Sequence, residues 1–146
     1  MKGAVVPNWY DLICIINSVC YACIALKLYN LTSDIVFLPL LASGLASVIF
    51  RIYRYCYNKC DSKLWYCNET GKVLFMIDLL LAVASIMLVF KYIDNNMFCT
   101  MTVSSVLSWF LYAISKCTIS YVLHIIAHIV LTLSLINVVH KKRKNR

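Results

Sequence analysis

Five stretches of mostly apolar residues, each about as long as a membrane is thick, limit most strongly what this chain can fold into. They cover residues 10–29, 34–53, 73–92, 97–115 and 118–139 of the 146-residue sequence. About 20 apolar residues cross a bilayer as a helix, and a helix satisfies its own backbone hydrogen bonds in lipid. We therefore expect one all-α domain, a multi-pass transmembrane helical bundle of about five spans.

The composition argues against a soluble enzyme. Apolar residues make up 62% of the chain and charged residues only 14%, whereas a soluble domain needs a more charged surface. With three glycines, at positions 3, 44 and 71, the chain cannot build a glycine-rich phosphate-binding loop. Neither a GxSxG nor an HExxH motif is present. Any catalysis would have to come from polar side chains within the membrane.

The formal charge of +8 gathers in residues 51–72 and in a basic C-terminal tail, residues 140–146. Both flank apolar segments, so we interpret them as membrane-border charge facing the cytosol or anionic headgroups, and we expect no nucleic-acid partner. With five spans, the two groups of basic residues lie on opposite sides of the membrane. Their charge therefore does not decide which end of the bundle faces the cytosol. Arg143 and Lys144 resemble a dibasic retrieval signal of an ER-like endomembrane, and a stop-transfer flank is the alternative.

Two sequons, Asn30-Leu-Thr and Asn68-Glu-Thr, are candidates for N-glycosylation. They fall in successive loops on opposite sides, so only one can be used if the span between them crosses the membrane. Among eight cysteines, Cys56, Cys60 and Cys67 share one polar loop. The loop lacks the paired CxxC spacing and the fourth ligand of a zinc knuckle. If the loop faces an oxidising lumen, two of these cysteines could instead form one disulfide.

Polar residues inside the apolar stretches are the candidates for function, because ionisable side chains are costly in a bilayer. Alternation of the spans places all of them in the leaflet next to the loop 54–72. We therefore expect one shared polar site, and the alternative is polar contacts between helices, with an arginine reaching the headgroups. The residues are Ser47, Arg51, Asp78, His124 and His128.

His124 and His128 are four positions apart, so both imidazoles project from one face of a helix. Two such imidazoles can bind one zinc ion if a neighbouring helix supplies a third ligand. Asp78 is the candidate for that ligand, or for a residue that holds a metal-bound water. Ser47 is the candidate for contacting this water or a substrate carbonyl. Ser47 and Asp78 are therefore the candidate catalytic residues.

This pattern resembles the CREST superfamily of membrane hydrolases, which includes the alkaline ceramidases, the adiponectin-receptor group and the myomaker branch. The matching residues are Ser47, Asp78 in Met76-Ile-Asp-Leu-Leu-Leu-Ala, and the histidine pair in Tyr121-Val-Leu-His-Ile-Ile-Ala-His. The resemblance implies that three histidines hold zinc while the serine and the aspartate handle water or the substrate carbonyl. It also implies hydrolysis of a lipid amide or ester.

The chain departs from the family in two ways. Arg51 stands where the first histidine is expected, and a guanidinium stays protonated and cannot bind a cation. The family has seven spans, and about five are expected here. Two interpretations stay open. In one, His124, His128 and Asp78 bind zinc without a third histidine. In the other, Arg51 replaces the metal and forms a buried ion pair with Asp78.

Three functions follow from these observations. The favoured one is a non-catalytic or degenerate CREST-like bundle with a structural or assembly role, acting with other membrane proteins or as a homo-oligomer. The chain is small and rich in Tyr, Asn, Lys, Ile and Cys, so a compact viral protein in a host membrane would fit. The alternative is a zinc-dependent hydrolase with a lipid substrate. A channel or transporter ranks last, because the polar residues lie at one depth and no inverted repeat is visible.

Overall fold

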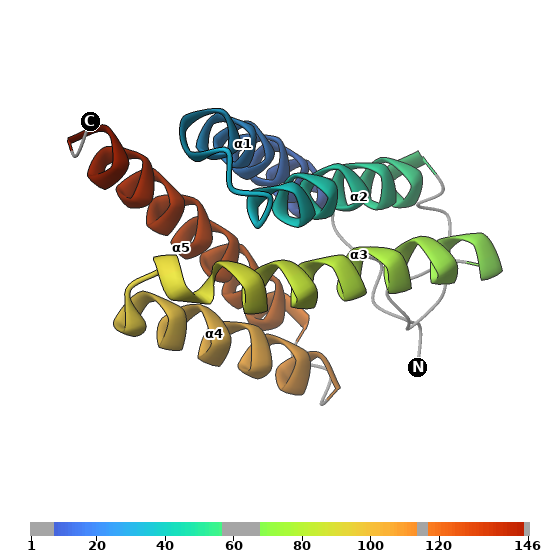
Figure 1. Ribbon diagram of the computed structural model, residues 1–146. Helices are drawn as coiled ribbons and strands as arrows, with labels where there is room; N and C mark the ends of the chain where they lie inside the picture. Colours follow the sequence, from blue (N-terminus) through green and yellow to red (C-terminus); the bar gives the residue numbers. More distant parts are fainter. Residues whose placement is uncertain (1–7, 57–67, 114–116, 145–146) are drawn as a thin grey trace.

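The computed structural model describes residues 8–56, 68–113 and 117–144. Within these residues the chain is all-α, as the sequence predicts, with five long helices and one short 3-10 helix that extends the third (Figure 1). The bounds are α1 Asn8–Thr32, α2 Phe37–Cys56, α3 Glu69–Val89, η1 Phe90–Tyr92, α4 Asn95–Ala113 and α5 Cys117–Lys144.

Among the described residues, four helices are long and apolar enough to cross a membrane: α1, α2, α3 with η1, and α5. The fifth expected span corresponds to α4, which has 19 residues and no charged side chain. Its sequence begins with two asparagines and contains two threonines and three serines, and these polar residues lower its mean hydropathy. The expectation of about five spans is therefore confirmed in part: five long helices are present, and four of them are candidate spans among the described residues.

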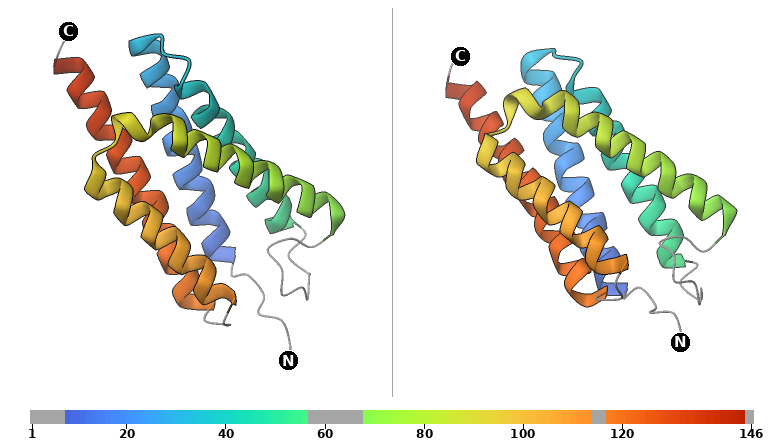
Figure 2. Two further views of the ribbon diagram at one scale, coloured as in Figure 1. Left: turned by 60° about the horizontal axis from the view of Figure 1, so that its bottom comes forward. Right: turned by 90° about the horizontal axis from the view of Figure 1, so that it is seen from below.

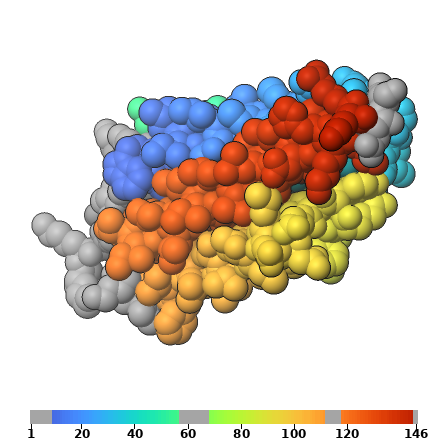
Figure 3. Space-filling view, turned by 90° about the vertical axis from the view of Figure 1, so that its left-hand side faces the viewer, coloured from blue at the N-terminus to red at the C-terminus, as the bar shows by residue number. Residues whose placement is uncertain are grey.

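The helices pack in the spatial order α3, α2, α1, α5, α4, since the main contacts are α2 with α3, α1 with α2, α1 with α5, and α4 with α5. We call proximal the end at which α1, α3 and α5 begin, and distal the end that holds residues 33–36 and 93–94. α1 begins at the proximal end and α5 ends at the distal end, as both views of Figure 2 show. Figure 3 shows α5 lying between α1 and α4 on one face of the molecule.

α1 and α2 approach each other most closely at Gly44. A Cβ atom at this position would lie 2.7 Å from Cβ of Ala22 and 3.1 Å from the carbonyl oxygen of Ser18, both on α1. Small residues at a helix contact allow two backbones to come close, which favours packing in a membrane. α2 is therefore held against α1 along the face that also carries Ser47 and Arg51, and this contact fixes the depth of both side chains.

α4 and α5 are joined by two buried serines. The hydroxyl of Ser108 on α4 donates to the carbonyl oxygen of Ser120 on α5 at 2.8 Å, and the hydroxyl of Ser120 donates back to the carbonyl oxygen of Ser108 at 2.7 Å. Each hydroxyl satisfies a backbone oxygen of the opposite helix, where no water competes. The pair ties α4 to α5 near the proximal end.

The predicted basic tail is helical as far as the structure describes it. Residues 140–144 continue α5 and are exposed, while residues 145–146 lie outside the described residues. Asn30 is exposed in the last turn of α1, and Asn68 caps the first turn of α3, so the two sequons lie at opposite ends of the bundle. Cys56 is exposed with a free thiol, whereas Cys60 and Cys67 lie outside the described residues.

Candidate functional site

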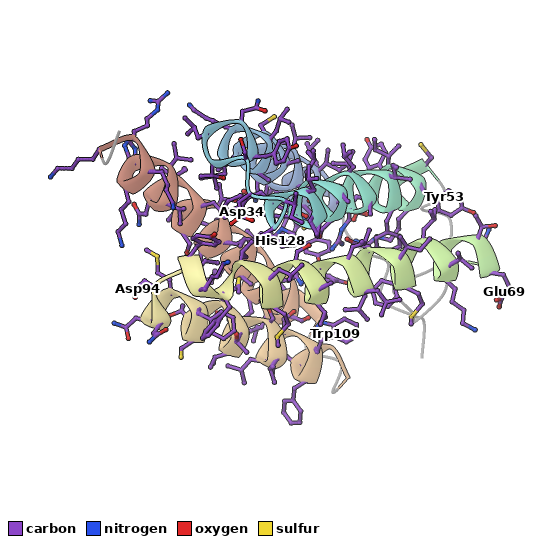
Figure 4. All side chains as sticks on the ribbon, in the orientation of Figure 1. Asp34, Tyr53, Glu69, Asp94, Trp109 and His128 are labelled. Atoms are coloured by element: carbon purple, nitrogen blue, oxygen red, sulfur yellow. The ribbon has the colours of Figure 1, made fainter. Side chains whose placement is uncertain are left out.

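The structure places the five predicted polar residues around one cavity of about 90 Å³. Figure 4 shows His128 in the middle of the bundle, and Glu69 and Asp94 at the two ends of the segment formed by α3 and η1. Aromatic and small side chains from α1, α3 and α4 complete the wall. The predicted residues that line this cavity are Ser47 and Arg51 from α2, Asp78 from α3, and His124 and His128 from α5.

Arg51 and the two histidines form a continuous chain of polar contacts. Nη2 of Arg51 lies 3.1 Å from Nε2 of His124, and Nε2 of His128 lies 3.1 Å from the same atom. A guanidinium can only donate, so Nε2 of His124 accepts and a neutral His124 carries its proton on Nδ1. His128 then donates from Nε2. Its Nδ1 atom is left as an acceptor, and this atom is buried without a partner among the described residues.

A buried acid that sequence reasoning missed, Asp11 on α1, pairs with two arginines. Nε of Arg54 lies 3.0 and 3.1 Å from the two carboxylate oxygens of Asp11, and Nη2 of Arg54 contacts the carboxylate as well. Nη1 of Arg51 lies 3.5 Å from the same carboxylate. All three residues are at most 3% exposed. Buried charges of this kind need partners, and here one carboxylate serves two guanidinium groups.

One of the two open interpretations paired Arg51 with Asp78, and the structure places Arg51 beside Asp11 instead. The physical reason is the packing of α1 on α2, which places the first turn of α1 beside the last turns of α2. The available signal was a single acid at the start of an apolar stretch, since Asp11 lies within the first predicted span. Its partner Arg54 follows Arg51 by three positions and therefore lies on the same face of α2.

The ring of Tyr10 packs near both guanidinium groups of this ion cluster and near Tyr121 at the start of α5. Its ring centroid lies 5.0 Å from Cζ of Arg51 and 5.5 Å from Cζ of Arg54, both within the range of cation–π attraction. The same ring lies 4.5 Å from the ring of Tyr121 and 5.9 Å from that of His124. Aromatic rings thus surround the guanidinium groups and limit their access to water.

Ser47 and Asp78 form the opposite side of the cavity. Ser47 is 2% exposed, and its hydroxyl is close enough to Asp78 to interact with the carboxyl group. Asp78 is half-buried, and it makes no ion pair within 4 Å with any described residue. The carboxyl group of Asp78 is therefore an acceptor that faces the cavity without a direct cationic partner.

The donor set does not fit a zinc site as these residues are arranged. A protein zinc site needs at least three ligands on one ion, and no three His, Cys, Asp or Glu side chains of the described residues converge in this way. The Nε2 atom of His124 is also in contact with a guanidinium. Binding of zinc by His124, His128 and Asp78 therefore stays a prediction that requires Arg51 to move away.

A second, apolar cavity of about 370 Å³ lies next to the polar one, between α3 and the α4–α5 pair. Six residues line both cavities, so the polar cavity forms one end of a longer space. Sequence reasoning missed this feature, because it depends on which helices pack together. The shared residues are Tyr21, Leu79, Ala82, Trp109, His124 and His128.

Comparison with known proteins returned no match: no family model, no curated protein and no solved structure is similar to this chain at a significant level. The resemblance to the CREST superfamily therefore rests on the short motifs around Ser47, Asp78, His124 and His128 alone.

Proposed function

We propose that this chain is a non-catalytic, multi-pass membrane protein in which Arg51 takes the position of a metal. Four candidate spans support its place in a membrane. The observation that carries the proposal is the 3.1 Å contact between Nη2 of Arg51 and Nε2 of His124. The lone pair that a zinc ion would need points at a permanently protonated donor instead.

Hydrolysis of a lipid amide or ester by a CREST-like protein would depend on zinc, which activates water and polarises the carbonyl. A guanidinium next to His124 repels a dication. A second arginine, Arg54, adds to the positive charge of the cluster, and Asp11 balances one of the two. We therefore propose that the CREST-like serine, aspartate and histidines are kept as a polar core of the bundle.

The proposed role is structural or assembly-related, in an endomembrane or a host membrane. The wide apolar surface of α3 supports residence among lipids or other membrane helices, since only three of its residues are buried. The exposed basic end of α5 supports contact with anionic headgroups at the distal border.

A zinc-dependent lipid amidase or esterase is the second candidate function, and one observation favours it. The Nε2 atoms of His124 and His128 face each other at 3.1 Å. That separation is close to the roughly 3.3 Å between two nitrogen ligands of a tetrahedral zinc ion. The side chain of Arg51 would have to turn away for this function.

The metal content of detergent-purified protein distinguishes the non-catalytic bundle from the zinc-dependent hydrolase. Wild type is compared with the double variant His124→Ala/His128→Ala, and size-exclusion chromatography checks that both are folded. We expect less than a tenth of an equivalent of zinc in either protein after incubation with zinc and desalting. Near-stoichiometric zinc in the wild type that disappears in the double variant would overturn the proposal in favour of the hydrolase.

A further inference from the structure

The apolar cavity reaches the surface that faces the bilayer. Val83 on α3 and Val106 on α4 both line it, and both are more than half exposed. The cavity therefore extends to the outer surface between these two helices. Its volume of about 370 Å³ lies in the range of ligand sites in proteins. In a membrane, the molecules that reach such an opening are lipids.

The shape of the cavity suits a single acyl chain of a lipid. Along α5 its lining runs from His124 to Leu131, a rise of about 10 Å at 1.5 Å per residue. Beyond His128 the walls are mainly apolar, formed by residues such as Leu40, Ile86 and Met101. Apolar walls of this kind do not favour water, and an acyl chain would make dispersion contacts with them.

The polar end lies towards the proximal side and the apolar walls lie towards the centre of the bundle. On α3, Asp78 precedes the cavity-lining residues Leu79, Ala82 and Ile86 along a helix that enters from the proximal end. A lipid of the proximal leaflet has the same polarity, with its headgroup at the border and its chain towards the middle. The cavity and a single-chain lipid therefore match in direction.

The polar groups at the proximal end of the cavity can accept hydrogen bonds from a ligand. Asp78 interacts with the hydroxyl of Ser47 but has no ion pair within 4 Å, and Nδ1 of His128 is buried without a partner, in both cases among the described residues. Both are acceptors, and the nearest cation, Arg51, is already in contact with Asp11 and His124. A carboxylate headgroup would meet the carboxyl group of Asp78 and bring no donor. Hydroxyl groups can donate to both acceptors.

The charges of the cluster favour a headgroup without charge. The site holds two guanidinium groups, Arg51 and Arg54, and two carboxyl groups, Asp11 and Asp78, so its net charge is zero when both carboxyl groups are ionised. An amine would add one positive charge and a carboxylate one negative charge in a site of low dielectric. From the cavity, its direction and this balance, we infer that the bundle binds one single-chain lipid with an uncharged, hydroxyl-bearing headgroup, as in a monoacylglycerol. The inference rests on the proposed function, because Arg51 is counted as a residue that faces His124 in place of a metal.

Native mass spectrometry of the detergent-purified protein, titrated with monooleoylglycerol, oleylamine and oleic acid, tests this inference. These lipids share one chain and differ in the headgroup. We expect a one-to-one complex with monooleoylglycerol, at a Kd at least tenfold lower than for the other two. Binding of oleylamine or oleic acid as tightly as monooleoylglycerol would overturn the assignment of the headgroup, and the absence of any complex would overturn the whole inference.

Two matched variants on α3 locate the site. Ala82→Phe fills the region shared by both cavities, whereas Ala84→Phe adds the same ring on an exposed position of the same helix. We expect Ala82→Phe to weaken binding at least tenfold and Ala84→Phe to leave it within twofold. Equal binding by the two folded variants would overturn the site. If Ala82→Phe does not fold, the same titration is carried out with Asp78→Asn. We expect this variant to lose the preference for monooleoylglycerol over oleic acid.

The zinc content of the same preparations separates this inference from the proposed function. Protein without zinc that binds none of the three lipids contradicts the lipid site only. Protein with stoichiometric zinc contradicts the proposed function, whatever lipid it binds. Protein that lacks zinc and binds monooleoylglycerol supports both.

Discussion

Nη2 of Arg51 on α2 lies 3.1 Å from Nε2 of His124 on α5, although the two residues are 73 positions apart in the sequence. Nη1 of the same guanidinium lies 3.5 Å from Asp11 on α1. One side chain thus connects the three helices α1, α2 and α5 and joins the ion cluster to the histidine pair. A substitution of Arg51 therefore changes both the charge balance of the cluster and the availability of the histidines.

Replacing this arginine by histidine should create a zinc site. In Arg51→His the permanent charge is removed and an imidazole stands one helical turn after Ser47, while Arg54 still balances Asp11. We expect about one equivalent of zinc to remain bound after desalting, measured by atomic emission. Arg51→Gln is the matched control, since it removes the charge without adding a ligand, and it should bind none. A folded Arg51→His variant without zinc would show that the arginine is not what excludes the metal.

Removing the acid of the ion cluster should be strongly destabilising. Asp11→Ala leaves Arg51 and Arg54 buried without their carboxylate partner, and breaking a buried pair in this way costs about 3–5 kcal/mol. The free energy of unfolding in mixed detergent and SDS micelles measures this loss. Glu69→Ala serves as the control, because Glu69 and Lys72 form an exposed pair at 3.9 Å, and exposed pairs contribute about 0–1 kcal/mol. Similar losses in both variants would contradict the buried role of Asp11.

The sequence predicts the helices well, because the length of each apolar stretch is set by the thickness of the bilayer. α1, for example, spans Asn8–Thr32, two and three residues beyond the predicted limits of 10 and 29. It also predicts that Ser47, Arg51, Asp78, His124 and His128 lie at similar depth, since alternate spans run in opposite directions. Depth is a local property of each stretch.

The identity of neighbouring helices is not a local property, and the remaining errors follow from it. Arg51 pairs with Asp11 rather than Asp78 because α1 packs against the same face of α2. The apolar cavity exists because α3 and α4, which are consecutive in the chain, take the two ends of the packing order. No spacing in the sequence encodes that order. α4 differs from a span through its polar residues, which pack in part against α5, as Ser108 does.

A methyl group at position 44 should push α1 and α2 apart. Gly44→Ala gains about 1 kcal/mol of helix propensity, but its Cβ would lie 2.7 Å from Cβ of Ala22, and overpacking of this kind costs about 1–3 kcal/mol. We expect a net loss of stability in thermal unfolding, and a larger loss for Gly44→Leu. Ala42→Leu, on the exposed side of the same helix, should change the unfolding temperature little. A stabilised Gly44→Ala variant would contradict the close packing.

The serine pair between α4 and α5 should show coupling in a double-mutant cycle. Ser108→Ala and Ser120→Ala each remove one of the reciprocal bonds of 2.8 and 2.7 Å. Bonds of this kind between membrane helices contribute about 0.6 kcal/mol on average and up to about 1.7 kcal/mol. The double variant should therefore lose less stability than the two single losses added together. A cycle between Ser120 and the exposed Thr102 of α4 is the control, and equal coupling in both cycles would contradict the contact.

The distal end should lose stability in acid through Asp34, which lies between α1 and α2. The hydroxyl of Tyr92 donates a hydrogen bond to its carboxylate, and this bond, with the backbone N–H of Val36, lowers the pKa of Asp34 below its ordinary value of 3.8. Lys91 and Lys142 lower it further. Because the pKa is lower in the folded than in the unfolded protein, the stabilisation is complete above about pH 4 and is lost as the pH falls through the folded value.

Tyr92→Phe tests this dependence, since it removes the donor and keeps the ring that packs 5.2 Å from the ring of Phe37. Between pH 6 and pH 3 the unfolding temperature of the wild type should fall more steeply than that of the variant, and the two curves should converge at the acid end. Tyr55→Phe, an exposed tyrosine near the end of α2, should follow the wild-type curve. Parallel curves for Tyr92→Phe and wild type would show that the bond from Tyr92 does not lower the pKa of Asp34 in the folded protein, because only a group whose pKa differs between the two states makes stability depend on pH.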